Sequence, residues 1–225
     1  MALEIWKILD KHDIICQAIH VPGENNSIAD FQSRNFSDSN DYYLYQSSFS
    51  HLISLLPFRP TIDLFATRVS TKLNKYVSWK YDPYAVKINA FSFTWTENSY
   101  LFPPIYLIDK CISKLISDNV DKALIITPAW QGLNSMPLII QHLFHHPIFI
   151  PFEHIGGYQP TRYRFHLMAF PFSANPARRE TYHQTLSRPC SRVFHKKHLL
   201  PTLGYGNALV SMLEKQGHKI SFLLN

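Results

Sequence analysis

Three stretches in the middle of the chain have the hydrophobic patterns of an α/β core. Residues 62–65 form a short, mainly apolar segment. Residues 123–127 form a continuous apolar run, which is typical of a strand buried on both faces. Between them, apolar residues recur at three- and four-residue steps from Ile105 to Ile116, which predicts an amphipathic helix. The centre of the chain is therefore predicted to be strand, helix, strand.

Weaker patterns extend this prediction along the chain. The further predicted elements are helices over 2–9, from residue 25 or 26 to 34, over 49–56, over 136–144 and after residue 176, with strands over 14–20, 74–79, 148–150 and 165–169. Two strand–helix–strand passages in order imply mainly parallel pairing with right-handed crossovers. We therefore predict an α/β fold, with a mainly parallel, Rossmann-like sheet and flanking helices. The regularity is expected to be lost after residue 150.

Composition supports a packed protein with long connections. The chain has 225 residues, 46% of them hydrophobic, and only 7 glycines against 15 prolines. Its 3 cysteines are far apart in the sequence, which favours a reducing, intracellular compartment over a disulfide framework. Residues 1–20 lack the apolar region of a signal peptide, and no run of 18 apolar residues occurs, so no membrane association is expected.

The net charge of +6 is concentrated late in the chain. The basic residues that could contact a nucleic acid are Arg162, Arg164, Arg188, Arg192, Lys196 and Lys197. Such a surface would attract a polyanion through counterion release. A merely solvated basic tail explains the same pattern, and both interpretations remain open. Three histidines, at 142, 145 and 146, have helical spacing that suits zinc, but they have no acidic or cysteine partner nearby, so the end of a helix is favoured.

A specific polar motif occupies residues 20–34, where the sequence reads HVPGENNSIADFQSR. This motif resembles the last strand, turn and helix of the RNase H domain of retroelement reverse transcriptases. The resemblance places Asp30 at that family's final metal-binding carboxylate. Cleavage with two metal ions about 4 Å apart needs several carboxylates, and the others would lie upstream of Met1. Asp30 would thus bind Mg²⁺ only in a complete RNase H.

Five further motifs follow in a fixed order. They are DLFA at 63–66, SWKYDP at 78–83, NAFSFTW at 89–95, FPPI at 102–105 and LIITPAW at 124–130. This order resembles the region of DIRS-type retrotransposons that is similar to phage-type Dam DNA adenine N6-methyltransferases and that follows RNase H. The resemblance implies a methyltransferase-related sheet with an S-adenosylmethionine site.

The residues that would carry methylation are changed. The family's turn has a polar residue, two prolines and an aromatic ring, which hold the target amine and stack on a flipped base. This chain has Phe102, Pro103, Pro104 and Ile105 in their place. Asp63 could contact the cofactor, although capping of the next turn is the favoured role. No glycine occurs between residues 23 and 132, whereas a cofactor loop usually needs one.

These resemblances divide the chain into four predicted parts. They are an RNase H remnant (1–36), a linker (37–58), a Dam-like α/β domain (59–150) and a basic connector (151–225). The predicted function is that of a retrotransposon polyprotein fragment, catalytically incomplete, that binds nucleic acid weakly and non-specifically and needs no cofactor. An upstream reverse transcriptase polypeptide is a further expected partner. Two alternatives stay open, an active S-adenosylmethionine-dependent DNA adenine methyltransferase and a protein-interaction scaffold.

Overall fold

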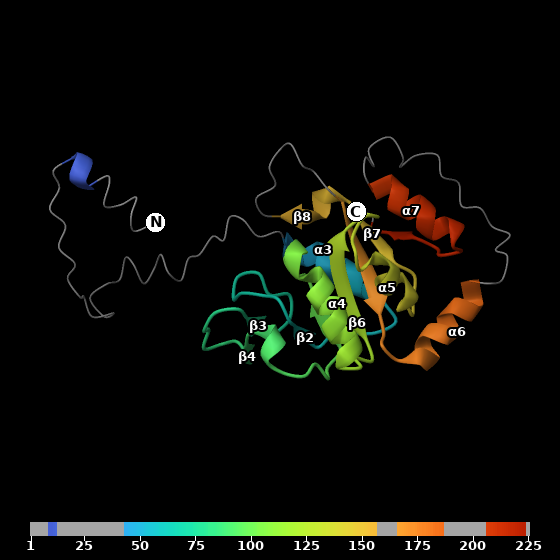
Figure 1. Ribbon diagram of the computed structural model, residues 1–225, viewed down its shortest axis with the longest axis horizontal. Helices are drawn as coiled ribbons and strands as arrows, with labels where there is room; N and C mark the ends of the chain where they lie inside the picture. Colours follow the sequence, from blue (N-terminus) through green and yellow to red (C-terminus); the bar gives the residue numbers. More distant parts are fainter. Residues whose placement is uncertain (1–8, 13–42, 157–165, 187–205, 224–225) are drawn as a thin grey trace. The chain divides into compact units, whose positions relative to one another are not determined.

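The computed structural model describes residues 9–12, 43–156, 166–186 and 206–223. The chain divides into two compact units, residues 1–39 and 40–225. Nearly all described residues belong to the second unit, whose elements are labelled in Figure 1. The predicted RNase H remnant, including Asp30, falls outside the described residues apart from a short stretch at 9–12.

A six-stranded sheet forms the centre of the second unit. Its strand order is β10–β7–β9–β6–β5–β2. The strands are β2 (Ile62–Asp63), β5 (Ser99–Leu101), β6 (Ala123–Pro128), β7 (Ile148–Ile150), β9 (Leu167–Phe172) and β10 (Ser221–Phe222). The pairs β2–β5, β5–β6 and β10–β7 are parallel, whereas β9 is antiparallel to both β6 and β7. All strands of this sheet except β9 therefore point the same way, as the mainly parallel pattern predicted.

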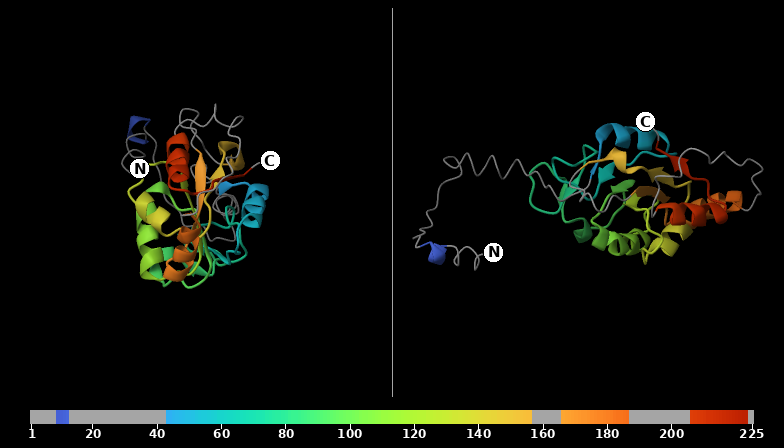
Figure 2. Two further views of the ribbon diagram at one scale, coloured as in Figure 1. Left: turned by 90° about the vertical axis from the view of Figure 1, so that its right-hand side faces the viewer. Right: turned by 90° about the horizontal axis from the view of Figure 1, so that it is seen from above.

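Helices cover both faces of the sheet (Figures 1 and 2). The helices are α3 (Gln46–Ser54), α4 (Ile108–Ser117), α5 (Met136–Gln141), α6 (Pro176–Leu186) and α7 (Gly206–Lys215). One apolar core joins the sheet to α4, α5 and α7, and a second core joins the opposite face to α3. The alternation of side chains along each strand divides them between these two cores. The protein is thus a three-layer α/β unit.

Smaller elements complete the unit. They are β1 (Tyr43–Leu44), β3 (Val77–Ser78), β4 (Lys87–Ile88), β8 (Ile155–Gly156) and the 3₁₀ turns η2 (Ala90–Ser92), η3 (Ile105–Leu107) and η4 (Phe152–His154). Strands β1 and β8 pair antiparallel, and β3 and β4 pair parallel. Among the described residues, no helix is long and apolar enough to cross a membrane.

The helix predicted from the apolar period in the middle of the chain is confirmed. Helix α4 buries Ile108, Cys111, Ile112 and Leu115 against the sheet. Its first predicted turn differs, because residues 105–107 form the 3₁₀ turn η3 directly after Pro104. A 3₁₀ turn is a common start for a helix, since it shortens the first hydrogen-bonded rings.

Two expectations about the later part of the chain are wrong. The helix predicted over 136–144 ends at Gln141, because Leu143 forms a bridge with Phe172 instead of continuing the helix. The expected loss of regularity after residue 150 is also incorrect, since β9 lies inside the sheet and all of its residues are buried. The sheet consequently extends beyond the segment 59–150, and α3 packs on it from within the predicted linker.

Candidate functional site

Three of the five motifs, those at 63–66, 102–105 and 124–130, meet at one edge of the sheet. Asp63 ends β2, Phe102 follows β5, and Ala129 follows β6. Because these three strands are parallel and adjacent, their carboxyl ends lie side by side. The carboxyl edge of such a sheet is where α/β proteins bind ligands. This edge is therefore the candidate site, and its chemistry depends on which side chains reach solvent there.

Asp63 is turned into the protein. Only 2% of the Asp63 surface is exposed. One carboxylate oxygen accepts the backbone N–H of Phe65 at 3.3 Å, and the other accepts that of Lys72 at 3.1 Å. Burial raises the pKa of Asp63 from 3.8 to about 7, against the lowering effect of these two hydrogen bonds. The carboxyl group thus caps the following loop, and in this conformation it has no exposed surface to offer a cofactor.

Tyr100 is a second buried polar group at this edge, and the sequence motifs did not indicate it. It is the register partner of Asp63 across β2 and β5. Its hydroxyl is buried and has no hydrogen-bond partner among the described residues. Burial and the nearby Asp63 carboxylate both raise the pKa of Tyr100. The ring meets Phe49 of α3 edge-on, with 4.9 Å between centroids. The sequence feature that could have indicated Tyr100 is its position just before the proline turn.

The turn after β5 is occupied by apolar packing. Phe102 is half-buried against the α3-side core, and Ile105 is half-buried against the opposite core. Pro103 is buried, whereas Pro104 is exposed at the start of η3. No side chain of these four residues carries a hydrogen-bonding group. These four residues therefore present no side-chain acceptor for a substrate amine, and the nearest exposed ring is that of the next residue, Tyr106.

The aromatic motif at 89–95 has a structural role. Trp95 is buried, and its indole N–H donates to the carbonyl oxygen of Ala90 at 2.7 Å. The Trp95 backbone N–H donates to Asp118 at 2.8 Å, which joins the motif to the end of α4. Asn89 has a left-handed φ of 55° and accepts the backbone N–H of Phe91. Asparagine tolerates this conformation and caps the turn.

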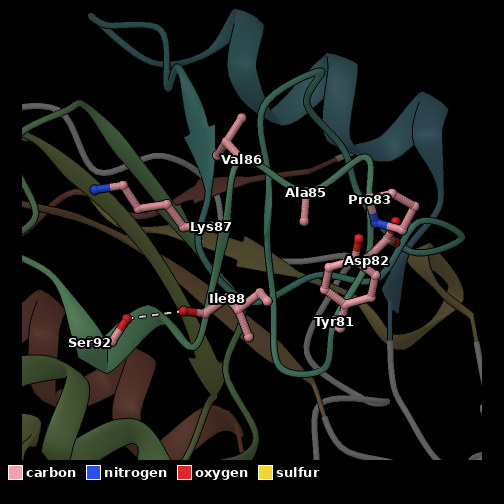
Figure 3. A pocket seen from close by; sticks show the side chains of 8 residues that line it. All are labelled: Tyr81, Asp82, Pro83, Ala85, Val86, Lys87, Ile88 and Ser92. Atoms are coloured by element: carbon pink, nitrogen blue, oxygen red, sulfur yellow. Dashed lines mark hydrogen bonds between the residues drawn. The ribbon is translucent and has the colours of Figure 1, made fainter.

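An open hollow lies beside β3 and β4 (Figure 3). Its volume is about 480 Å³. It is lined by Tyr81, Asp82, Pro83, Ala85, Val86, Lys87, Ile88 and Ser92. The residues of the proline turn and Asp63 do not line it, so it is separate from the site that the motifs predicted.

A second hollow of about 500 Å³ lies where α5 faces α7, and a histidine–tyrosine cluster adjoins it. The Tyr182 hydroxyl is 3.0 Å from Nδ1 of His146 and 2.9 Å from Nδ1 of His218. A hydroxyl carries one proton, so it donates to one ring and accepts from the other. Burial lowers the pKa of His146 and of His218 to about 4, with help from neighbouring positive charges. Both rings are therefore neutral at pH 7.

The three histidines at 142, 145 and 146 do not share a helix face. His142 caps the end of α5, its Nδ1 is 2.8 Å from the carbonyl oxygen of Leu138, and its ring stacks on Phe172. His145 and His146 lie beyond the helix. Within the described ranges, no group of three or more potential metal ligands is found.

The remaining predicted site residues cannot be placed. Asp30 and the basic residues Arg162, Arg164, Arg188, Arg192, Lys196 and Lys197 lie outside the described residues. Comparison with known proteins adds no family, since no protein-family model matches the chain and no curated protein is similar to it.

Proposed function

We propose that this chain is a fragment of a DIRS-type retrotransposon polyprotein. In this proposal the second unit is a methyltransferase-related sheet that no longer catalyses methyl transfer, and the remaining activity is non-specific association with nucleic acid. The residues before it are the end of an RNase H domain that is incomplete by itself. The proposal rests on the motif order in the sequence, and three observations of the second unit support it.

The first support is the architecture of the sheet. The resemblance implies a mainly parallel sheet, and all strands of the six-stranded sheet point the same way except β9, which lies between β6 and β7. The motifs at 63–66, 102–105 and 124–130 come from adjacent strands and reach the same carboxyl edge. A methyltransferase would bind its cofactor and target base at this edge.

The second support concerns the proposed loss of methyl transfer. Asp63, Phe102 and Ile105 occupy the positions that would meet cofactor, target amine and base, and all three pack into the protein. Turning Asp63 outward would break its two backbone hydrogen bonds. Each buried N–H left without a partner costs about 1–3 kcal/mol. The site is thus filled by the protein's own side chains.

The third support concerns nucleic acid. The whole chain has a net charge of +6, and basic residues on a folded surface release counterions from a bound polyanion. A retroelement protein also works in the presence of its own nucleic acid. We therefore expect binding that depends on charge and that does not depend on sequence.

Fluorescence anisotropy with labelled oligonucleotides of unrelated sequence tests this function. The expected affinity is similar for each sequence and falls steeply with added salt. On a plot of log K against log salt concentration, the slope should be about −0.7 for each neutralised phosphate of a single strand. Binding that is absent, independent of salt or confined to one sequence would refute the proposed nucleic-acid association.

A further inference from the structure

The segment of residues 66–93, here called the β3–β4 lobe, extends past the carboxyl end of β2. Asp63 N–H donates to the carbonyl oxygen of Lys75, and Ala66 N–H donates to that of Val77. Strand β3 thus runs beside the end of β2, and the loop that follows it leads to β4. The lobe is built from the same edge at which the sheet would bind ligands, but its surface is separate from the buried motif residues.

Three large aromatic side chains of this lobe face solvent. Trp79 is 69% exposed, Tyr81 is 79% exposed and Tyr84 is 68% exposed. All three lie in the loop between β3 and β4. Single exposed apolar residues are common on protein surfaces, whereas a group of them in one loop is typical of an interaction site. The rings therefore indicate a partner that aromatic faces recognise.

Asp82 holds this loop in a defined conformation. One of its carboxylate oxygens accepts Arg68 Nη2 at 2.8 Å and the Tyr84 N–H at 3.0 Å, and the other accepts the Tyr76 hydroxyl at 2.8 Å. These bonds lower the pKa of Asp82 to about 2, so the carboxylate is charged at pH 7. The loop backbone at Tyr84 is thus held before any partner arrives, which reduces the entropy that the loop loses on binding.

The charge of the lobe points to a polyanion. Between residues 66 and 93 the sequence has five basic residues, Arg68, Lys72, Lys75, Lys80 and Lys87, and one acidic residue, Asp82. Lys80 and Lys87 are exposed on the same stretch as the rings. The Arg68 guanidinium lies over the Tyr84 ring at 4.1 Å from its centroid. Aromatic faces interleaved with basic residues are the pattern by which proteins bind single-stranded nucleic acid.

We propose that the β3–β4 lobe is a stacking platform for single-stranded nucleic acid. Bases stack on Trp79 and Tyr81, while Lys80 and Lys87 contact phosphates. A duplex keeps its bases paired inside, so aromatic stacking selects unpaired strands. The inference rests on the proposed association with nucleic acid and names its surface and substrate class.

The hollow beside the loop suits this binding mode. In Figure 3, Tyr81, Asp82 and Pro83 lie on one side of it, and Lys87 and Ile88 of β4 lie on the other. The hollow has a volume of about 480 Å³ and is open to solvent, so in our proposal an unpaired base can approach it while its neighbour stacks on the loop.

The test measures anisotropy of a labelled single strand of about 12 nucleotides, and of the same sequence as a duplex, for the full chain. The variant Trp79→Ala/Tyr81→Ala should bind the single strand about tenfold more weakly or worse. Tyr106→Ala is the matched control, because Tyr106 is 82% exposed and belongs to η3, outside the lobe. It should bind like the wild type. Equal melting temperatures should accompany both changes, since these rings are exposed.

A second readout separates stacking from a general loss of affinity. A base stacked on Trp79 should quench indole fluorescence, and Trp79→Phe should retain affinity while losing most of that quenching. Lys80→Ala and Lys87→Ala should each reduce the salt slope by about 0.7, whereas Lys215→Ala should leave it unchanged.

The outcomes distinguish this inference from the proposed function. If the double aromatic variant binds the single strand as tightly as the wild type does, the stacking platform is refuted. It is also refuted if the wild type binds duplex and single strand equally. Either result leaves the proposed nucleic-acid association intact. Failure of the wild type to bind any oligonucleotide refutes both, and a lobe that instead captures a protein partner would then explain the exposed rings.

Discussion

At the scale of single residues, buried titrating groups dominate the candidate edge and the histidine cluster. Two backbone N–H groups donate to Asp63 and lower its pKa, whereas burial raises it. The effect of burial is larger, so the pKa rises to about 7. Burial also favours the neutral forms of His146 and His218, but for imidazoles this lowers the pKa. A carboxyl group and two imidazoles thus oppose each other in their effect on the pH dependence of stability.

Replacing Asp63 by Asn should change that pH dependence. Between pH 3.8 and about 7 the folded state keeps the Asp63 proton that the unfolded chain releases, so Asp63 lowers the free energy of unfolding as pH rises. Without this group, the free energy of unfolding should rise more steeply with pH over the same window. Urea unfolding of wild type and Asp63→Asn at several pH values measures the slope. Parallel curves would show that Asp63 has an ordinary pKa.

Replacing Tyr182 by Phe should destabilise the protein by about 1–3 kcal/mol, because the imidazole nitrogens of half-buried His146 and buried His218 lose their shared partner. For the wild type, the pKa values of His146 and His218 fall from 6.5 to about 4 on folding. The stability that they confer is therefore full above pH 6.5 and is lost as pH falls toward 4. Thermal unfolding at neutral pH and at mildly acidic pH provides the measurement. Thr181→Ala, on the exposed side of α6, is the control.

At the scale of elements, the strongest hydrophobic patterns were sufficient to predict a helix and a strand. Helix α4 and strand β6 could be predicted because one has a regular apolar stripe and the other an unbroken apolar run. A strand was predicted over 165–169, and β9 extends it to Phe172 although Pro171 lies within it, where a proline argues against a central strand. It is tolerated because β7 pairs only as far as Ala169, so β7 needs no N–H from Pro171.

The place of β9 predicts which fragment can fold. A fragment of residues 59–150 lacks the strand that pairs with both β6 and β7, and it also lacks the α7 residues Leu209 and Leu213 in the core. It should show no cooperative unfolding transition. A fragment of residues 40–225, which is the complete second unit, should unfold cooperatively. Near-ultraviolet circular dichroism during urea titration compares them. A cooperative transition for 59–150 would show that β9 is dispensable.

The candidate site was only partly legible in the sequence. In the structure, Asp63 and the proline turn lie at one edge, because parallel strands place their carboxyl ends together. The inward direction of Asp63 depends on Lys72, nine residues away, whose N–H it accepts. The exposure of Trp79 and Tyr81 likewise depends on how the loop after β3 leaves the sheet. Neither follows from local spacing, since both are set by tertiary packing.

At the scale of the whole molecule, the second unit combines a mainly parallel α/β sheet with a carboxyl edge at which the protein's own side chains are packed. Stability favours this arrangement, because Phe102 and Ile105 add apolar contacts where a polar turn would need solvent or a substrate. Fold and function are separable in this way, since function resides in the site and the sheet can persist without it. In our proposal, the β3–β4 lobe beside this edge is the surface that binds nucleic acid.

The most direct test of this account is the melting temperature of the full chain with S-adenosylmethionine at millimolar concentration. A ligand that binds only the folded state stabilises it by about 2.7 kcal/mol at 100 times its dissociation constant, which would raise the melting temperature by about 5–10 °C. The account predicts no change, with Asp63 and the proline turn remaining packed. A rise of several degrees that S-adenosylhomocysteine reproduces and ATP does not would contradict it, because the edge would then still bind the methyl donor.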